Sequence, residues 1–125
     1  WGICLDRVGN LYAVDAYNSR IQVFDSRGRF LRKWGDVGGG DGEFWSPSFL
    51  ALDDECNVYV TDETNSRIQV FDSQGQFLCK WGTYGNGDGE FYLPYGIAVD
   101  GEERVYVGDM GNDRIQVFKR VSSSG

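Results

Sequence analysis

The sequence Asn-Ser-Arg-Ile-Gln-Val-Phe-Asp-Ser occupies residues 18–26 and returns, letter for letter, at 65–73. A third copy at 112–118 reads Asn-Asp-Arg-Ile-Gln-Val-Phe. Each copy begins 47 residues after the one before, and a fixed period of this length is typical of solenoids, propellers and other repeat architectures. The period divides the chain into repeats at 2–48, 49–95 and 96–125.

The composition favours short strands over helices. Aromatic residues make up 15% of the chain and there are 18 glycines but only 2 prolines, a mixture that suits strands joined by glycine turns. No apolar run approaches the roughly 18 residues that a membrane span needs. A charged segment followed by an apolar leader is also absent, so we expect neither a membrane segment nor a targeting segment.

The second repeat shows the strand pattern most clearly. Four segments carry β-branched, aromatic or alternating apolar residues, at 50–53, 58–62, 67–71 and 76–81. Turns of a few residues separate them, and such turns join antiparallel strands. Residues 82–89 then form a connection whose glycines suit turn positions with positive φ. Four antiparallel strands per repeat predict a propeller blade, and a parallel β-helix of the same period is the less favoured alternative.

Three motifs between residues 94 and 118 carry a resemblance to a known family. They read Pro-Tyr-Gly-Ile-Ala-Val-Asp at 94–100, Val-Tyr-Val-Gly-Asp at 105–109 and Asn-Asp-Arg-Ile-Gln-Val-Phe at 112–118. Together they resemble the NHL repeat, and the resemblance extends over essentially the whole chain in three copies. It implies a propeller, commonly six-bladed, whose members mostly act as protein- or RNA-binding platforms. A few relatives of this family, such as an amidating lyase, are enzymes.

The strand count predicts a ring that is not closed. Nothing after Phe118 resembles the Phe-Leu-x-Lys-Trp-Gly of a fourth strand, and propellers need about four to eight blades to close. The expected fold is therefore an all-β, NHL-type propeller of four-stranded antiparallel blades that forms a partial ring of about three blades. Because exposed blade faces drive association, we expect either self-association, with two copies head to tail, or the remainder of a longer propeller to complete it. On this basis the isolated chain should not be a monomer.

Three polar residues recur around the loop between the second and third strands of every repeat. Asp ends the second strand, and Arg at the start of the third can reach back to it, while Asn is expected to hydrogen-bond the local turn backbone. A catalytic site is needed once, whereas a brace is needed in every blade. The pattern thus predicts a structural brace made of Asp15, Asn18, Arg20, Asp62, Asn65, Arg67, Asp109, Asn112 and Arg114.

Residues that differ between equivalent loops are the candidates for partner binding, since contact residues commonly lie on loops held by a rigid scaffold. Tyr17, Glu63 and Met110 occupy the same loop position in the three repeats. Arg27 and Arg29 belong to a basic cluster of the first repeat, whose simplest interpretation is a solvated hairpin tip. The acidic turns at 53–55 and 101–103 are expected on the opposite face from the Tyr17, Glu63 and Met110 loops.

Catalysis and metal binding are not expected within these residues. The chain has no His, which excludes a Ser-His-Asp triad and a His-ligated zinc. The acidic residues of the glycine-rich connections do not match a calcium loop, and no Lys-Ser/Thr follows the glycines as in a phosphate loop. Three scattered cysteines provide no disulfide or zinc pattern and favour a reducing compartment such as the cytoplasm. We expect no metal and no cofactor.

The charge disfavours nucleic acid as a partner. The net charge is −7, and it divides as zero over residues 1–47, −6 over 48–94 and −1 over 95–125. Proteins that bind nucleic acids usually carry a basic face. The expected function is therefore a non-catalytic binding or scaffold module with a protein partner. The alternatives are an RNA-binding NHL propeller and a segment of a propeller enzyme whose catalytic residues lie outside this chain.

Overall fold

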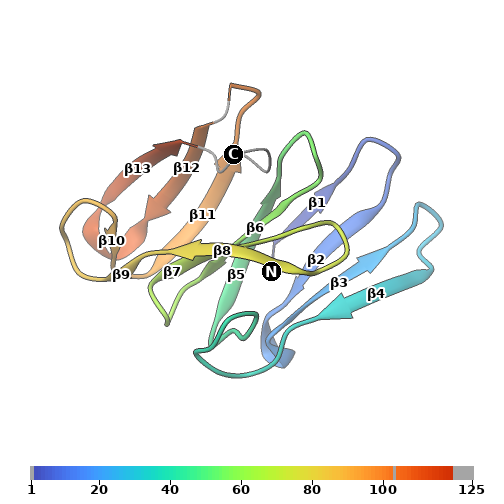
Figure 1. Cartoon of the computed structure of the whole chain (residues 1–125), viewed down its shortest axis with the longest axis horizontal. Coiled ribbons are helices and arrows are strands. Elements are labelled where there is room, and N and C mark those ends of the chain that lie inside the picture. Colours follow the sequence, from blue (N-terminus) through green and yellow to red (C-terminus); the bar gives the residue numbers. More distant parts are fainter. Residues whose placement is uncertain (1, 103, 120–125) are drawn as a thin grey trace.

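The chain forms three antiparallel sheets that lie side by side and are here called blades 1, 2 and 3 (Figure 1). The computed structural model describes residues 2–102 and 104–119, so the end of the third repeat lies outside the described residues. Blade 1 contains β1 (Ile3–Leu5), β2 (Leu11–Asp15), β3 (Arg20–Phe24) and β4 (Phe30–Trp34). Blade 2 contains β5 (Pro47–Leu52), β6 (Val58–Asp62), β7 (Arg67–Phe71) and β8 (Phe77–Trp81). Blade 3 contains β11 (Pro94–Val99), β12 (Arg104–Asp109) and β13 (Arg114–Lys119).

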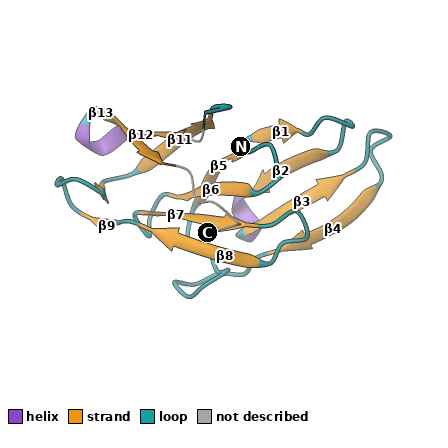
Figure 2. Cartoon of the chain, turned by 45° about the horizontal axis from the view of Figure 1, so that its top comes forward, coloured by secondary structure: helices purple, strands orange, loops and turns teal. Residues whose placement is uncertain are grey.

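Strand order within each blade follows sequence order, and every neighbouring pair is antiparallel. The prediction of a partial propeller with four-stranded antiparallel blades is confirmed, and the β-helix alternative is wrong. Short 3-10 helices, η1 (Ala16–Asn18) and η2 (Met110–Asn112), lie in the loops after β2 and β12. Figure 2 shows them in purple beside the strands. No helix in the described ranges is long and apolar enough to cross a membrane.

Two details of the second repeat differ from the expectation. β5 begins at Pro47 rather than at residue 50, because a register shift between Pro47 and Leu50 lets the strand continue and pair Pro47 with Asp62. The connection after β8 also contains two short strands, β9 (Thr83–Tyr84) and β10 (Glu90–Phe91), which pair in parallel. Their pairing closes the glycine-rich segment into a compact loop.

The core lies between blades, and each blade uses both of its faces. The face of blade 2 toward blade 1 carries Val58, Val60 and Phe71, and we call this face, and the equivalent face of each other blade, the front face. The face toward blade 3, the back face, carries Tyr59, Ile68 and Val70. Alternate residues of a strand point to opposite faces, so a blade with neighbours on both sides buries every residue of β6 and β7.

Aromatic side chains from the connections fill the wider space between outer strands. We call residues 35–46 the first connection and residues 82–93 the second connection. Phe44 of the first connection stacks on Phe71 with ring centroids 5.6 Å apart, and Phe91 of the second lies 5.7 Å from Phe118. Gly82, with φ of +112°, lets the backbone pass this ring, because a Cβ there would lie 2.7 Å from Phe91.

The ends of the blades form two distinct surfaces. The loop surface carries the β2–β3, β6–β7 and β12–β13 loops together with the connections. The turn surface carries the β1–β2 and β5–β6 turns and the tip of the β3–β4 hairpin. In Figure 1 these turns lie along the upper edge and the loops along the lower edge. The register fixes this arrangement, because Asp15 pairs with Arg20 at one end of blade 1 and Leu11 pairs with Phe24 at the other.

Candidate functional site

Arg67 holds the first connection against blade 2. Its Nε lies 3.3 Å from Asp62 Oδ2, and both side chains are buried, with exposed fractions of 8% and 0%. The two terminal nitrogens of Arg67 donate to backbone carbonyls of the first connection: Gly39 at 2.9 Å, Gly40 at 3.0 Å and Glu43 at 2.8 Å. The guanidinium therefore joins the carboxylate of its own blade to a segment of chain that leaves the preceding blade.

Asn65 and Gln69 extend the same interaction. Asn65 donates to Asp62 Oδ2 at 2.7 Å and to the Gly38 carbonyl at 3.1 Å. Gln69 donates to the Glu43 carbonyl at 2.7 Å and accepts from the Gly42 N–H at 2.9 Å. We call these four side chains, Asp62, Asn65, Arg67 and Gln69, the clasp of blade 2. The clasp binds the backbone of the glycine-rich first connection of the same chain.

Blade 3 repeats the clasp on the second connection. Arg114 Nε lies 2.8 Å from Asp109 Oδ2, and its other nitrogens donate to the carbonyls of Asn86, Gly87 and Glu90 at 2.8–3.0 Å. Asn112 and Gln116 likewise reach the carbonyls of Gly85 and Glu90. The partners in blade 3 lie 47 residues after those in blade 2, so the geometry recurs with the sequence period.

Blade 1 carries the same four side chains with partners only in its own blade, among the residues that the structure describes. Arg20 Nε, Asn18 and Gln22 all donate to Asp15 Oδ2, at 2.9, 3.0 and 3.0 Å. The Arg20 side chain is 30% exposed, against the 8% of Arg67. The clasp of blade 1 is thus formed but faces solvent.

The clasp differs in two respects from the sequence expectation. Asn65 was expected to bond the turn backbone, and this is wrong, because its amide turns to the Asp62 carboxylate and to the preceding connection. The expected brace also lacks the glutamine of each clasp, which is Gln22, Gln69 or Gln116. The sequence contains a signal for it, because this polar residue stands at the same place within the apolar β3, β7 and β13 strands. The role of these residues as a structural brace stays a prediction, now directed at the connections.

Hydrogen bonds lower the pKa of the clasp carboxylates in blades 1 and 3. Burial would raise the pKa of Asp109, but bonds from the Asn112 amide, the Tyr92 N–H and Arg114 outweigh it and hold that pKa below its ordinary value. The Asn18 amide is the largest influence on Asp15, and with Arg20 and Gln22 it lowers the pKa against the opposing effect of desolvation. At the turn surface, the backbone N–H of Arg104 is the largest influence on Asp100 and helps to lower its pKa to about 2.

We therefore expect stability to fall in acid. A carboxyl whose folded pKa is depressed contributes stability above its unfolded pKa, about 3.9, and that contribution is lost as the pH falls through the folded value. The urea midpoint should change little between about pH 7 and 5 and should fall steeply from about pH 4 to 2. In the Asp109→Asn variant the urea midpoint should fall less steeply as the pH is lowered from about 4 to 2. A fall as steep as that of the unmodified chain would contradict the contribution of Asp109 to acid sensitivity.

A hollow of about 370 Å³ on the loop surface brings together side chains from three blades. Tyr17 comes from the blade 1 loop, Glu63 from the blade 2 loop and Tyr95 from β11 of blade 3. Ser48 Oγ donates to Glu63 Oε2 at 2.7 Å, and the Glu63 N–H donates to the Ser46 carbonyl at 2.9 Å. The carboxylate is held in place while the Tyr17 ring is 93% exposed.

The other candidate contact residues lie elsewhere. Met110 occupies the equivalent loop of blade 3 and is exposed, but it does not line the hollow. Arg27 and Arg29 lie at the tip of the β3–β4 hairpin on the turn surface, where Arg29 pairs with Asp25 at 2.9 Å. Arg32 of the same basic cluster turns inward and donates to the Ser73 carbonyl at 2.7 Å. The five candidate contact residues of the sequence analysis therefore do not form one surface. They are Tyr17, Glu63, Met110, Arg27 and Arg29.

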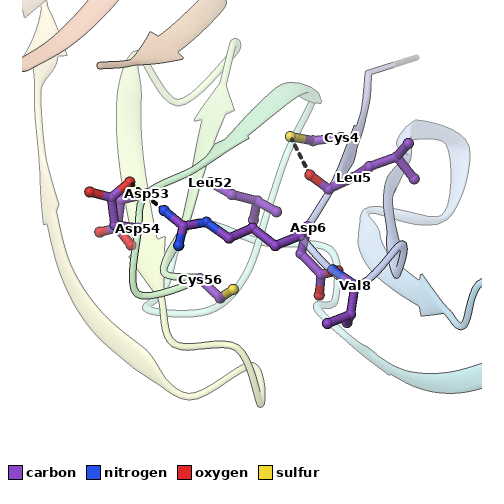
Figure 3. A pocket seen from close by; sticks show the side chains of 9 residues that line it. Cys4, Leu5, Asp6, Val8, Leu52, Asp53, Asp54 and Cys56 are labelled. Atoms are coloured by element: carbon purple, nitrogen blue, oxygen red, sulfur yellow. Dashed lines mark hydrogen bonds and ion pairs between the residues drawn. The ribbon is translucent and has the colours of Figure 1, made fainter. Parts of the chain in front are cut away.

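A second hollow, of about 290 Å³, lies on the turn surface between blades 1 and 2 (Figure 3). Its lining includes the thiols of Cys4 and Cys56 and the carboxylates of Asp53 and Asp54. Burial, followed by the charges of Asp6 and Asp53, raises the pKa of Cys56, so this thiol stays protonated at neutral pH and is a poor nucleophile. Nowhere in the described chain do three His, Cys, Asp or Glu side chains gather as metal ligands would.

Comparison with known proteins identifies the family to which this architecture belongs. A family described as a 6-bladed beta-propeller matches residues 54–122, more than half of the chain. The chain belongs to this six-bladed β-propeller family. Protein lin-41 of Caenorhabditis elegans is 46% identical over 33 residues, which are 26% of this chain and 3% of lin-41. The expected NHL-type propeller is confirmed.

Solved structures show the same propeller fold at low sequence identity. An auxiliary nutrient binding protein from Bacteroides thetaiotaomicron matches with a TM-score of 0.76 and 22% identity, over 92% of this chain and 36% of that one. Hydrazine synthase from Kuenenia stuttgartiensis gives 0.74 and 18%, over 94% and 32%. Virginiamycin B lyase from Staphylococcus aureus gives 0.65 and 17%, over 98% and 42%. The chain spans less than half the length of each of these proteins.

Proposed function

We propose that this propeller segment is a non-catalytic interaction module that binds a protein partner at the loop-surface hollow. The observation that carries the proposal is the convergence of Tyr17, Glu63 and Tyr95 from three blades around one hollow. The two tyrosine rings and the Glu63 carboxylate, which Ser48 holds in place, suit contact with a protein segment. Aromatic side chains are enriched in the cores of protein interfaces. Further exposed apolar side chains continue the same surface, namely Trp45, Tyr92 and Met110.

The chemistry of the hollow favours a cationic side chain in the partner. Glu63 Oε2 accepts a bond from Ser48, which leaves further acceptor positions on the carboxylate for a Lys or Arg head group. The Tyr17 and Tyr95 rings can pack against the aliphatic stem of such a side chain. The module should therefore prefer a segment in which a basic residue stands among apolar ones.

Two observations support a binding role over catalysis within these residues. A catalytically inactive form of Staphylococcus aureus virginiamycin B lyase has a histidine replaced by alanine, whereas the present chain contains no His. The raised pKa of Cys56 also makes this thiol of the turn-surface hollow a poor nucleophile. Binding at the loop surface uses groups that the chain does possess.

The test is to select peptides from a displayed random library on the unmodified chain and to measure their affinities by calorimetry. We expect enriched peptides to contain Lys or Arg, and Tyr17→Ala and Glu63→Gln each to weaken binding about tenfold, the scale of an interface contact worth just over 1 kcal/mol. Phe30→Ala, an exposed ring on the turn surface, is the matched control and should bind normally. Peptides that bind all variants equally would refute the proposal, as would sequence-specific RNA binding at physiological salt.

A further inference from the structure

Two exposed tyrosine rings meet on the second connection. Tyr84 ends β9 and Tyr92 follows β10, and their ring centroids lie 5.5 Å apart at an interplanar angle of 80°. They line a hollow of about 260 Å³ together with Gly85, Asn86 and Asn112, and we call these five residues the tyrosine corner. Its lining shares no residue with that of the loop-surface hollow, so the two hollows are separate sites.

The scaffold does not need the side chains of this corner. The first connection is held in the same way, by an Asn amide and an Arg guanidinium that donate to its carbonyls. It nevertheless carries different side chains at the places of Tyr84, Asn86 and Tyr92, which are Val37, Gly39 and Trp45. The Tyr84 ring is also 73% exposed, so packing does not account for it.

The backbone around the two rings is fixed. The Tyr92 N–H donates to Asp109 Oδ1 at 2.8 Å, and the Tyr92 carbonyl accepts from the Gly111 N–H at 2.7 Å. Gly111 lies directly against the ring, since a Cβ there would be 2.6 Å from Tyr92 Cγ. The β9–β10 ladder pairs Tyr84 with the buried Phe91. The corner is therefore formed before a ligand arrives, which lowers the entropic cost of binding.

The corner offers hydrogen bonds without charge. Both hydrogens of the Asn112 amide are used, on the Gly85 carbonyl and on Asp109, which leaves its oxygen as an acceptor. Asn86 is exposed, and its side-chain amide has no bonding partner among the residues that the structure describes. Two phenol hydroxyls complete the set. These groups suit a ligand whose own polar groups both donate and accept.

The surrounding charges disfavour an ionic ligand. Arg67 and Lys80 border Tyr84 on its other side, but they pair with Asp62 at 3.3 Å and with Asp41 at 2.6 Å. The five lining residues of the corner are uncharged, and residues 48–94 carry a net charge of −6. A phosphate group would find no unpaired cation here, and a cation would find no carboxylate in the lining.

We propose that the tyrosine corner binds one pyranose ring of a neutral carbohydrate. Such a ring has a face of C–H groups, which packs on one tyrosine ring while the other tyrosine bounds its edge. Its hydroxyls match the Asn112 oxygen and the Asn86 amide, because a hydroxyl both donates and accepts. The hollow is near the lower end of the size range of small-molecule sites, so it holds one sugar unit and leaves the neighbouring units in solvent.

Saturation-transfer NMR on the unmodified chain tests the proposal. The probes are neutral trisaccharides of glucose, galactose, mannose and xylose, each as the free sugar and as its methyl glycoside. Comparing the two forms distinguishes recognition of a free reducing end from that of a unit within a longer glycan. We expect transfer to the ring C–H protons of at least one trisaccharide, with a Kd on the order of 1 mM because one sugar unit makes few contacts.

Three substitutions copy residues of the first connection and should therefore keep the fold, which unchanged urea midpoints would verify. Tyr84→Val and Asn86→Gly should each weaken sugar binding about fivefold, since they remove a ring face and an amide. Asn86→Gly leaves in place the carbonyl that Arg114 uses. Tyr92→Trp should keep the binding, because it retains an aromatic face.

Val37→Ala, at the place in the first connection that corresponds to Tyr84, is the matched control and should bind the sugar normally. Tyr84→Val should also leave unchanged the binding of basic peptides at the loop-surface hollow, so failure of one site is distinguishable from failure of the other. The proposal is overturned if no trisaccharide shows transfer at about 10 mM, or if Tyr84→Val and Asn86→Gly bind it as well as the unmodified chain. Tighter binding of oligouridine at the same rings would also overturn it, because the ligand would then be a nucleobase.

Discussion

Replacing Arg67 with alanine should lower the free energy of unfolding by about 3 kcal/mol, a large part of the roughly 5–15 kcal/mol that stabilises a domain. The guanidinium is buried and donates to one carboxylate and three carbonyls. Its loss removes the side-chain donor of the Gly39 and Gly40 carbonyls and the counter-charge of Asp62, whereas the Glu43 carbonyl keeps its bond from Gln69. Asp62 keeps bonds from the Trp45 and Ser46 N–H groups and from Asn65, which places the cost at the lower end of the range for a broken buried pair.

Arg20→Ala is the internal control for this prediction, because it removes the same residue from the same repeat position. Arg20 and Asp15 are partly exposed, with side-chain fractions of 30% and 23%, so the expected loss is below about 1 kcal/mol. Arg67→Lys should fall between the two, since an ammonium keeps the charge but cannot match the planar fork of donors. Urea unfolding followed by tryptophan fluorescence measures all three variants. Equal losses for Arg67→Ala and Arg20→Ala would show that the connection contributes nothing to the strength of the clasp.

The contrast between these two arginines shows what the sequence could predict. Their repeated block fixes the register, the strand order and the pairing of Arg with Asp, because these depend on residues a few positions apart. The partners of Arg67 in the first connection lie 24–28 residues back and are backbone carbonyls, which leave no side-chain pattern to find. The sequence does not predict the partners of Asn65 for the same reason. The nearest turn backbone was the obvious partner, and a distant carbonyl was the actual one.

The loop-surface hollow was only partly foreseeable. Variation at equivalent positions singled out Tyr17 and Glu63, and the structure brings these two together. Tyr95 also differs from Ser48 at the equivalent position, but it lies on strand β11, so a search confined to loops does not find it. The sequence does allow the prediction that Arg27 and Tyr17 lie at opposite ends of blade 1, because successive turns of an antiparallel sheet alternate between its two ends.

Phe71→Ala should lower the free energy of unfolding by about 4 kcal/mol, in the range measured for buried phenylalanines. Phe71 is fully buried and lies among three rings, Phe44 at 5.6 Å, Trp34 at 5.7 Å and Phe77 at 6.0 Å. These rings come from the first connection, from blade 1 and from blade 2. The cavity would therefore loosen an interface between blades rather than the interior of one.

Phe24→Ala separates this effect from a general loss of apolar surface. Phe24 occupies the same repeat position, but it lies on the front face of blade 1 and contacts one ring, Phe30, at 6.0 Å. Its removal should cost about 1 kcal/mol, because the site is half-buried and can relax into solvent. Denaturant unfolding supplies the energies, and the fluorescence of Trp34 reports whether the interface has opened in the folded state. Equal costs for the two variants would mean that blade 1 already buries its front face against a partner in solution.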